Sequence, residues 1–132
     1  MIGFDTNVLL RALLDDDARQ SLLARQHLSA LTPARPGFIA VGVQLELYWV
    51  FERHYRMNRE EIAGIFEALM EISSLEFESF EALVRALHLY RTTGADLSDA
   101  LIAESNRMLG CVFTVTFDKQ AAQAIPSMDL IK

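Results

Sequence analysis

The sequence predicts an α/β protein in which helices cover both faces of a mostly parallel sheet. Short apolar stretches alternate along the chain with longer amphipathic ones, and turn-forming residues separate them. This alternation is typical of buried parallel strands joined by crossover helices. The length of 132 residues fits one domain, so we expect a single domain over residues 1–132.

The expected strands are short and rich in apolar or β-branched residues. They cover residues 1–4, 38–41, 75–78, 111–116 and 128–131. The fourth is the most regular, because Val and Thr recur in it. Cys111, the only cysteine, is expected inside this strand as a small apolar residue, and a lone cysteine excludes an internal disulfide.

The expected helices follow from apolar periodicity and capping residues. They cover residues 8–14, 18–31, 43–57, 59–72, 80–93, 97–109 and 119–124. Asn58 and Glu61 have the spacing of a reciprocal capping pair, and Ser79 is expected to cap the fifth helix. Leu22 and Leu23 are expected on the buried face of the second helix.

The composition narrows the class of protein. No apolar run approaches the roughly 18 residues of a membrane-spanning helix, and no basic segment precedes an apolar one at the N-terminus, so we expect a cytoplasmic protein. The net charge of −6 argues against a typical nucleic-acid binder and favours a protein partner. Ten of the twelve basic residues are arginines, which suit phosphate contacts.

Two aspartates follow expected strands. Asp5 comes directly after the first strand, and Asp118 comes two residues after the strand that ends at Thr116. Ligands of open parallel sheets bind beyond the carboxyl ends of the strands. Each aspartate can also be a simple helix N-cap, and the two readings stay open.

A third acid lies in an apolar helix. Glu46 is surrounded in sequence by Val, Leu, Tyr, Trp and Phe, so we expect it to be buried. A buried carboxylate needs a partner. That partner is either an arginine or a metal ion with its bound water.

Asp96 and Asp99 are three residues apart at the start of the sixth helix, so both carboxylates lie on one helix face. Together with Asp5, Glu46 and Asp118 they form an oxygen-only donor set, which suits Mg²⁺ or Mn²⁺ rather than zinc. Such ions activate water for phosphodiester hydrolysis. His27, His54 and His88 show no metal-ligand spacing, and we assign them no catalytic role.

These acidic segments resemble those of PIN-domain proteins. The resemblance covers Met1 to Leu10, which includes Asp5, then Glu46 to Val50, Asp96 to Ala103 and Thr114 to Lys119, in the family's order over nearly the whole chain. Within the family, the chain most resembles VapC-type toxins of type II toxin–antitoxin systems. The resemblance implies a three-layer α/β/α sandwich with a central, mostly parallel sheet.

The resemblance also implies an activity and residue roles. It implies a Mg²⁺- or Mn²⁺-dependent endoribonuclease in which Asp5 and Asp99 are the main metal ligands, supported by Asp96 and Asp118. Glu46 would orient water or a second ion. The resemblance also implies that three polar residues form hydrogen bonds to the acidic cluster: Thr6, Asn7 and Thr116.

The implied partners are RNA, a second copy of the chain in a homodimer, and a cognate antitoxin protein. RNA contacts are expected from four bases near the acidic segments: Arg11, Arg53, Arg56 and Lys119. An antitoxin groove could be formed by Tyr48, Trp49 and Phe51 with the second helix, although ordinary core packing is the more common role of such aromatic residues.

Two other functions compete with the nuclease. A non-enzymatic, receiver-like regulatory domain also gathers carboxylates around Mg²⁺, but it needs a paired acidic cluster early in the chain. Here Thr6 and Asn7 follow Asp5. A phosphatase with a nucleophilic aspartate needs a second aspartate two residues on, where this chain has Asn7.

Overall fold

The computed structural model describes residues 1–132 and confirms the predicted α/β class. Every strand pair is parallel, and helices connect the strands. The chain folds into two compact units. Unit 1 contains residues 1–56 and 64–78, and unit 2 contains residues 57–63 and 79–132. None of the helices is both long enough and apolar enough to cross a membrane.

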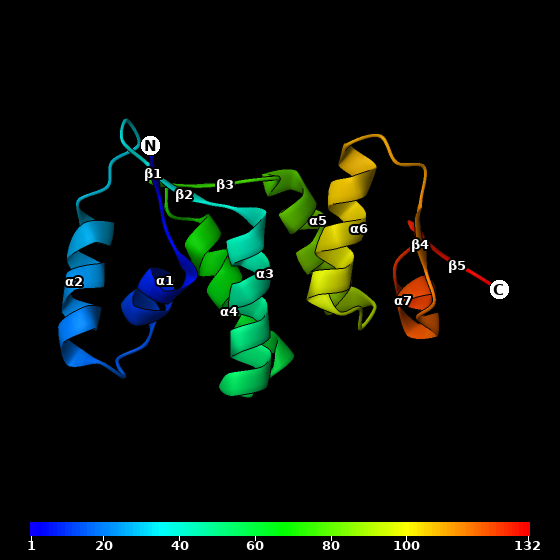
Figure 1. Cartoon of the computed structure of the whole chain (residues 1–132), viewed down its shortest axis with the longest axis horizontal. Coiled ribbons are helices and arrows are strands. Elements are labelled where there is room, and N and C mark those ends of the chain that lie inside the picture. Colours follow the sequence, from blue (N-terminus) through cyan, green and yellow to red (C-terminus); the bar gives the residue numbers. More distant parts are fainter. The chain divides into compact units, whose positions relative to one another are not determined.

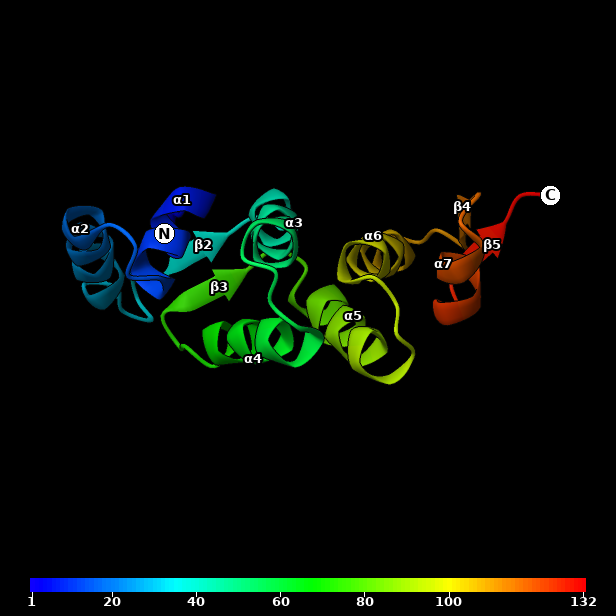
Figure 2. The same ribbon diagram turned by 90° about the horizontal axis from the view of Figure 1, so that it is seen from below.

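Unit 1 is built on a three-stranded sheet in the order β1-β2-β3 (Figure 1). Its strands are β1 (Ile2–Gly3), β2 (Gly37–Ile39) and β3 (Leu75–Phe77). The helices α1 (Thr6–Leu13) and α2 (Ala18–Ser29) lie between β1 and β2 in sequence. Figure 2 shows α3 (Val41–Trp49) on one side of the sheet and α4 (Arg59–Met70) on the other.

The core of unit 1 is aliphatic and aromatic. Leu9, Ile39 and Leu47 are fully buried, and the rings of Phe51 and Phe66 meet edge to face with centroids 6.3 Å apart. After Trp49, α3 continues as a π-helical turn, η1 (Val50–His54). This irregular turn ends the helix close to the expected position and leads into Arg56, which has a positive φ of 51°.

Unit 2 contains the start of α4, two long helices and a two-stranded parallel sheet. The long helices are α5 (Phe80–Thr92) and α6 (Leu97–Met108), which pack together. The strands are β4 (Thr114–Thr116) and β5 (Met128–Leu130), joined by α7 (Lys119–Ala124). The expected parallel strands are therefore distributed over two sheets, one of three strands and one of two.

The capping predictions have mixed outcomes. Asn58 and Glu61 form the predicted reciprocal pair: the Asn58 N–H donates to Glu61 Oε1 at 3.1 Å, and the Glu61 N–H donates to Asn58 Oδ1 at 2.8 Å. The prediction for Ser79 is wrong, because this residue adopts a left-handed conformation with φ 54° and its side chain makes no capping bond.

Two burial predictions are wrong as well. Leu22 and Leu23 are 59% and 47% exposed, whereas Ser21 and Ala24 form the buried face of α2. Cys111 is exposed and precedes β4, which begins only at Thr114.

Candidate functional site

Asp5 occupies the position expected for it, after β1 and before α1. It is the N-cap of α1, and its Oδ1 accepts a hydrogen bond from the Thr6 N–H at 2.9 Å. The side chain is exposed. The capping bond engages one carboxylate oxygen and fixes the orientation of the group at the end of the strand.

Thr6 connects two predicted site segments that are far apart in sequence. Its side chain is buried, and its hydroxyl donates to Glu46 Oε1 on α3 at 3.2 Å. Asn7, the next residue, lines an apolar pocket of about 280 Å³ with residues of α1 and α2. Asp5, Thr6 and Glu46 therefore form one polar group within unit 1.

The prediction that Glu46 is buried is wrong. Glu46 is exposed, and the buried polar side chain of α3 is Gln44 instead, at 1% exposure. Gln44 Nε2 donates to the carbonyls of Ile39 at 3.1 Å and Glu78 at 2.9 Å. Gln44 thus fixes α3 against the carboxyl ends of β2 and β3. The signal that singled out Glu46, a polar residue in an apolar helix, applies equally to Gln44.

Asp96 and Asp99 start α6 as a linked pair. Asp96 is the N-cap, and its Oδ1 accepts from the Asp99 N–H at 3.0 Å and from the Ser98 hydroxyl. Ser98 is buried. The cap therefore holds the Asp96 carboxylate beside the first turn, where Asp99 lies. The bond between Ser98 and Asp96 was not predicted from the sequence.

Asp99 is the acid whose ionisation the surroundings most clearly oppose. Burial raises the pKa of the Asp99 carboxyl, and the negative charges of Asp96 and Asp118 raise that pKa further. No basic side chain offsets this shift. Asp96 and Asp118 therefore both lie within electrostatic range of Asp99 in unit 2.

Asp118 is held by the end of β4 and the start of α7. The Asp118 N–H donates to Thr116 Oγ1 at 3.0 Å. Asp118 Oδ1 accepts from the N–H groups of Gln120 at 2.9 Å and Ala121 at 3.1 Å. Like Asp5, Asp118 is a helix N-cap that follows a strand.

The predicted acids thus fall into two groups, one in each unit. In unit 1, Thr6 makes hydrogen bonds with both Asp5 and Glu46, and in unit 2 Asp96 and Asp118 lie within electrostatic range of Asp99. The donors are all carboxylate oxygens, which fits Mg²⁺ or Mn²⁺ chemically. No set of three acidic, histidine or cysteine side chains closes around one common point in the structure.

The four bases expected to contact RNA have different surroundings. Arg11 is held by its own protein partners, Gln20 Oε1 at 2.7 Å and Asp16 Oδ1 at 3.4 Å. The guanidinium carbon of Arg53 lies 5.9 Å from the centre of the Trp49 ring. The other two bases, Arg56 and Lys119, are exposed.

The expected aromatic groove is wrong for two of its three residues. Tyr48 is 2% exposed and Phe51 is fully buried, so both belong to the core of unit 1. Trp49 is 39% exposed and carries Arg53 beside its ring. Of the three aromatic residues, Trp49 alone is accessible.

Comparison with protein families matches residues 2–125 to the PIN domain. No curated protein gives a significant match to the chain. The family match spans the four acidic segments and nearly every helix and strand described above. The chain therefore belongs to the PIN-domain family and has its α/β fold.

Proposed function

We propose that this PIN-domain protein is a Mg²⁺- or Mn²⁺-dependent endoribonuclease and the toxin component of a cytoplasmic toxin–antitoxin pair. PIN domains are generally metal-dependent nucleases, which supports the hydrolase class. The observation that carries the proposal is the acidic group of unit 2. Its carboxylates are close enough to raise the pKa of Asp99. Acids held together against their own repulsion are typical of cation sites.

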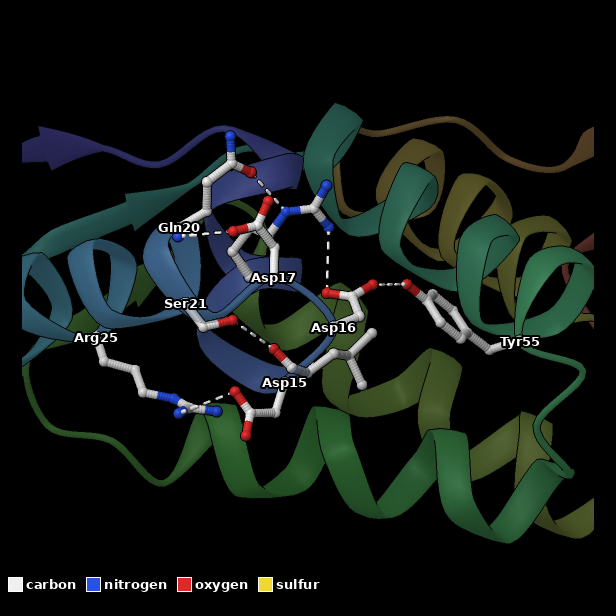
Figure 3. A network of polar contacts seen from close by, with 9 residues as sticks. Asp15, Asp16, Asp17, Gln20, Ser21, Arg25 and Tyr55 are labelled. Carbon is white, nitrogen blue, oxygen red and sulfur yellow. Dashed lines mark hydrogen bonds and ion pairs between the residues drawn. The ribbon is translucent and has the colours of Figure 1, made fainter.

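The other acidic run of the chain provides a contrast. Asp15, Asp16 and Asp17 are consecutive, yet each has a structural partner: Asp15 pairs with Arg25, Asp16 pairs with Arg11, and Asp17 caps α2 through the Gln20 N–H (Figure 3). Asp99 is influenced only by burial and by other carboxylates. A bound cation would remove that electrostatic cost.

We assign the residues the following roles. Asp5 and Asp99 ligate the cation, and Asp96 and Asp118 support it directly or through water. Glu46, oriented by the Thr6 hydroxyl, positions water or a second ion. When bound, the cation lowers the pKa of a water molecule and stabilises charge on the leaving oxygen.

The protein's own hydrogen bonds orient these acids in advance. Asp96 is fixed by Ser98 and the Asp99 N–H, and Asp118 is fixed by α7 and the Thr116 hydroxyl. Each capping aspartate uses its Oδ1 atom for these capping bonds, and Asp5 and Asp118 keep acceptor capacity for a ligand. Arg53, Arg56 and Lys119 supply the positive charge for the RNA backbone.

The proposed partners are RNA, a second copy of the chain and an antitoxin protein. The net charge of −6 favours an antitoxin arm that carries arginine. When RNA binds, bound cations and nearby basic side chains have to offset the protein's negative net charge.

Cleavage of RNA by the purified chain tests the activity. We expect cleavage with Mn²⁺ or Mg²⁺ and none with a chelator. Asp99→Asn should reduce the rate at least about 100-fold, beyond the usual effect of losing an outer-shell contact. Asp129→Asn removes an exposed acid from β5 and should leave the rate unchanged. Wild-type protein that cuts DNA but no RNA, or nothing in either metal, would refute the endoribonuclease.

Expression in a bacterial host tests the toxin role separately. The wild type should arrest growth, whereas Asp99→Asn at the same protein level should not. Growth at the normal rate with active enzyme in the cell would leave the nuclease standing and remove the toxin assignment.

A further inference from the structure

Arg59 makes an unusual set of contacts in unit 2. It is the first residue of α4, and its Nη2 donates to two backbone carbonyls, those of Tyr90 and Ala95, each at 2.6 Å. Its guanidinium carbon also lies 3.9 Å from the centre of the Tyr90 ring. Arg59 thus directs its charge to neutral carbonyl groups. By contrast, four other arginines form ion pairs with carboxylates, namely Arg11, Arg25, Arg91 and Arg107.

The two carbonyls bracket one turn. Tyr90 lies in the last turn of α5, where carbonyls lack helical partners, and Ala95 directly precedes the Asp96 cap of α6. Between them, Gly94 has a positive φ of 74°, and the Ala95 N–H donates to Thr93 Oγ1 at 3.3 Å. Arg59 therefore fastens both sides of the turn that leads into the acidic group.

The two acceptor residues of this arrangement are buried, whereas Arg59 itself is exposed. Tyr90 is 1% exposed and Ala95 is 2% exposed. Hydrogen bonds from a charged donor to buried carbonyls are stronger than neutral ones, and the flat guanidinium also stacks on an aromatic ring. Loss of Arg59 leaves the carbonyls of Tyr90 and Ala95 without these charged donors.

The direction of the Asp96 carboxylate depends on this turn. Asp96 continues the chain from Ala95, and its Oδ1 accepts from the Asp99 N–H and the Ser98 hydroxyl. A change in the Ala95–Asp96 peptide therefore alters the cap, and through the cap the relation between Asp96 and Asp99.

We propose that Arg59 is a positioning residue for the cation site: by holding the carbonyls of Tyr90 and Ala95, it sets the geometry of Asp96 and Asp99. This inference rests on the proposed function. Arg59 touches neither the cation nor RNA; it acts through the turn at residues 93–95.

The test compares Arg59→Met with Arg91→Met. Both variants remove one positive charge and loosen the contact between α4 and α5, because Arg91 pairs with Glu60 at 3.2 Å. Only Arg59 contacts the turn before Asp96. Arg59→Lys keeps the charge but lacks the planar fork, and it gives a second variant if Arg59→Met does not fold.

Hydrogen exchange provides a readout that does not depend on activity. The Asp99 N–H donates to Asp96 and should be protected in the wild type. We expect its exchange to be faster in Arg59→Met than in Arg91→Met, with Arg59→Lys intermediate. Equal protection of this amide in Arg59→Met and Arg91→Met would overturn the proposal.

Cation dependence provides the second readout. The Mn²⁺ concentration for half-maximal cleavage should rise about 10- to 100-fold in Arg59→Met, as for loss of an outer-shell partner, while KM for RNA stays unchanged. Arg91→Met should match the wild type. A lower melting temperature in Arg59→Met with unchanged Mn²⁺ dependence below melting would show a purely structural role. Wild type without Mn²⁺-dependent cleavage would instead refute the proposed function itself.

Discussion

The surroundings of Asp99 oppose the negative charge of its carboxylate, and a substitution that removes this charge removes the repulsion. Burial and the carboxylates of Asp96 and Asp118 raise its pKa. A raised folded-state pKa means that the contribution to stability is complete at low pH and is lost as pH rises through that pKa. At neutral pH the ionised Asp99 therefore destabilises the fold.

We accordingly expect Asp99→Asn to raise the melting temperature at neutral pH without metal. The increase should be small, because Asp99 is only partly buried and solvent screens the repulsion. Added Mn²⁺ should stabilise the wild type more than the variant. Thermal denaturation with and without Mn²⁺ measures both effects, and a variant less stable than the wild type without metal would contradict them.

Tyr55 makes a second titratable contact, in unit 1. Its hydroxyl donates to Asp16 Oδ2 at 2.8 Å, and Asp16 also pairs with Arg11, so the residue after η1 is tied to the loop between α1 and α2 (Figure 3). The hydrogen bond to Asp16 raises the pKa of the Tyr55 hydroxyl, and burial and the charge of Asp16 add to the effect.

The sign of this shift predicts a pH dependence. The bond should stabilise the fold fully below the usual tyrosine pKa of about 10 and should be lost as pH rises through the raised value. Tyr55→Phe should reduce the free energy of unfolding by about 0.5 kcal/mol at pH 8, the lower end for a hydrogen bond, because the phenol is largely solvated. Urea denaturation of both proteins at rising pH should show this difference vanish above the raised pKa; a constant difference would argue against the bond.

Among the elements, α2 shows how local polar bonds override an apolar pattern. Ser21 Oγ donates to the Leu14 carbonyl at 2.9 Å, and Arg25 Nε donates to the Ala12 carbonyl at 3.0 Å. These bonds satisfy carbonyls at the end of α1 and turn the small face of α2 toward it. Leu22 and Leu23 consequently face outward. Periodicity predicts the helix but not the polar partners that set its rotation.

The same limit applies to the site. The acids that begin elements were predictable, because a cap is a local feature: Asp5, Asp96 and Asp118 all cap helices at the expected positions. Glu46 was misjudged because an apolar helix does not reveal which of its polar residues turns inward. Contacts such as those of Arg59, which span more than thirty residues, leave no local signal.

Replacing two glycines with alanine tests the packing of the elements, because the two substitutions should change the free energy of unfolding in opposite directions. A Cβ on Gly37 in β2 would lie 2.8 Å from Leu31 Cδ1 and 2.9 Å from Leu75 Cδ2, whereas a Cβ on Gly42 in α3 would meet nothing within 4 Å. Gly37→Ala should destabilise the protein by about 1 kcal/mol through overpacking. Gly42→Ala should stabilise it by about 0.5–1 kcal/mol, since alanine favours the helix. Denaturant unfolding measures both, and destabilisation by Gly42→Ala would contradict the open surroundings.

For the whole molecule, the family match over residues 2–125 covers the acidic segments of both units. The acidic residues of the chain differ in their surroundings. The run at residues 15–17 is neutralised by arginines and a helix cap, whereas the acids of α6 and α7 repel one another. The proposed divalent cation would offset this repulsion, since carboxylate oxygens are the ligands that Mg²⁺ and Mn²⁺ prefer.

Calorimetric titration with Mn²⁺ tests whether these acids form a cation site. Wild type and Asp129→Asn should bind the ion with equal affinity, while Asp5→Asn and Asp99→Asn should each bind it at least about tenfold more weakly, because each loses a proposed ligand. Equal Mn²⁺ affinity in all four proteins, or no binding by the wild type, would contradict the cation site and the nuclease built on it.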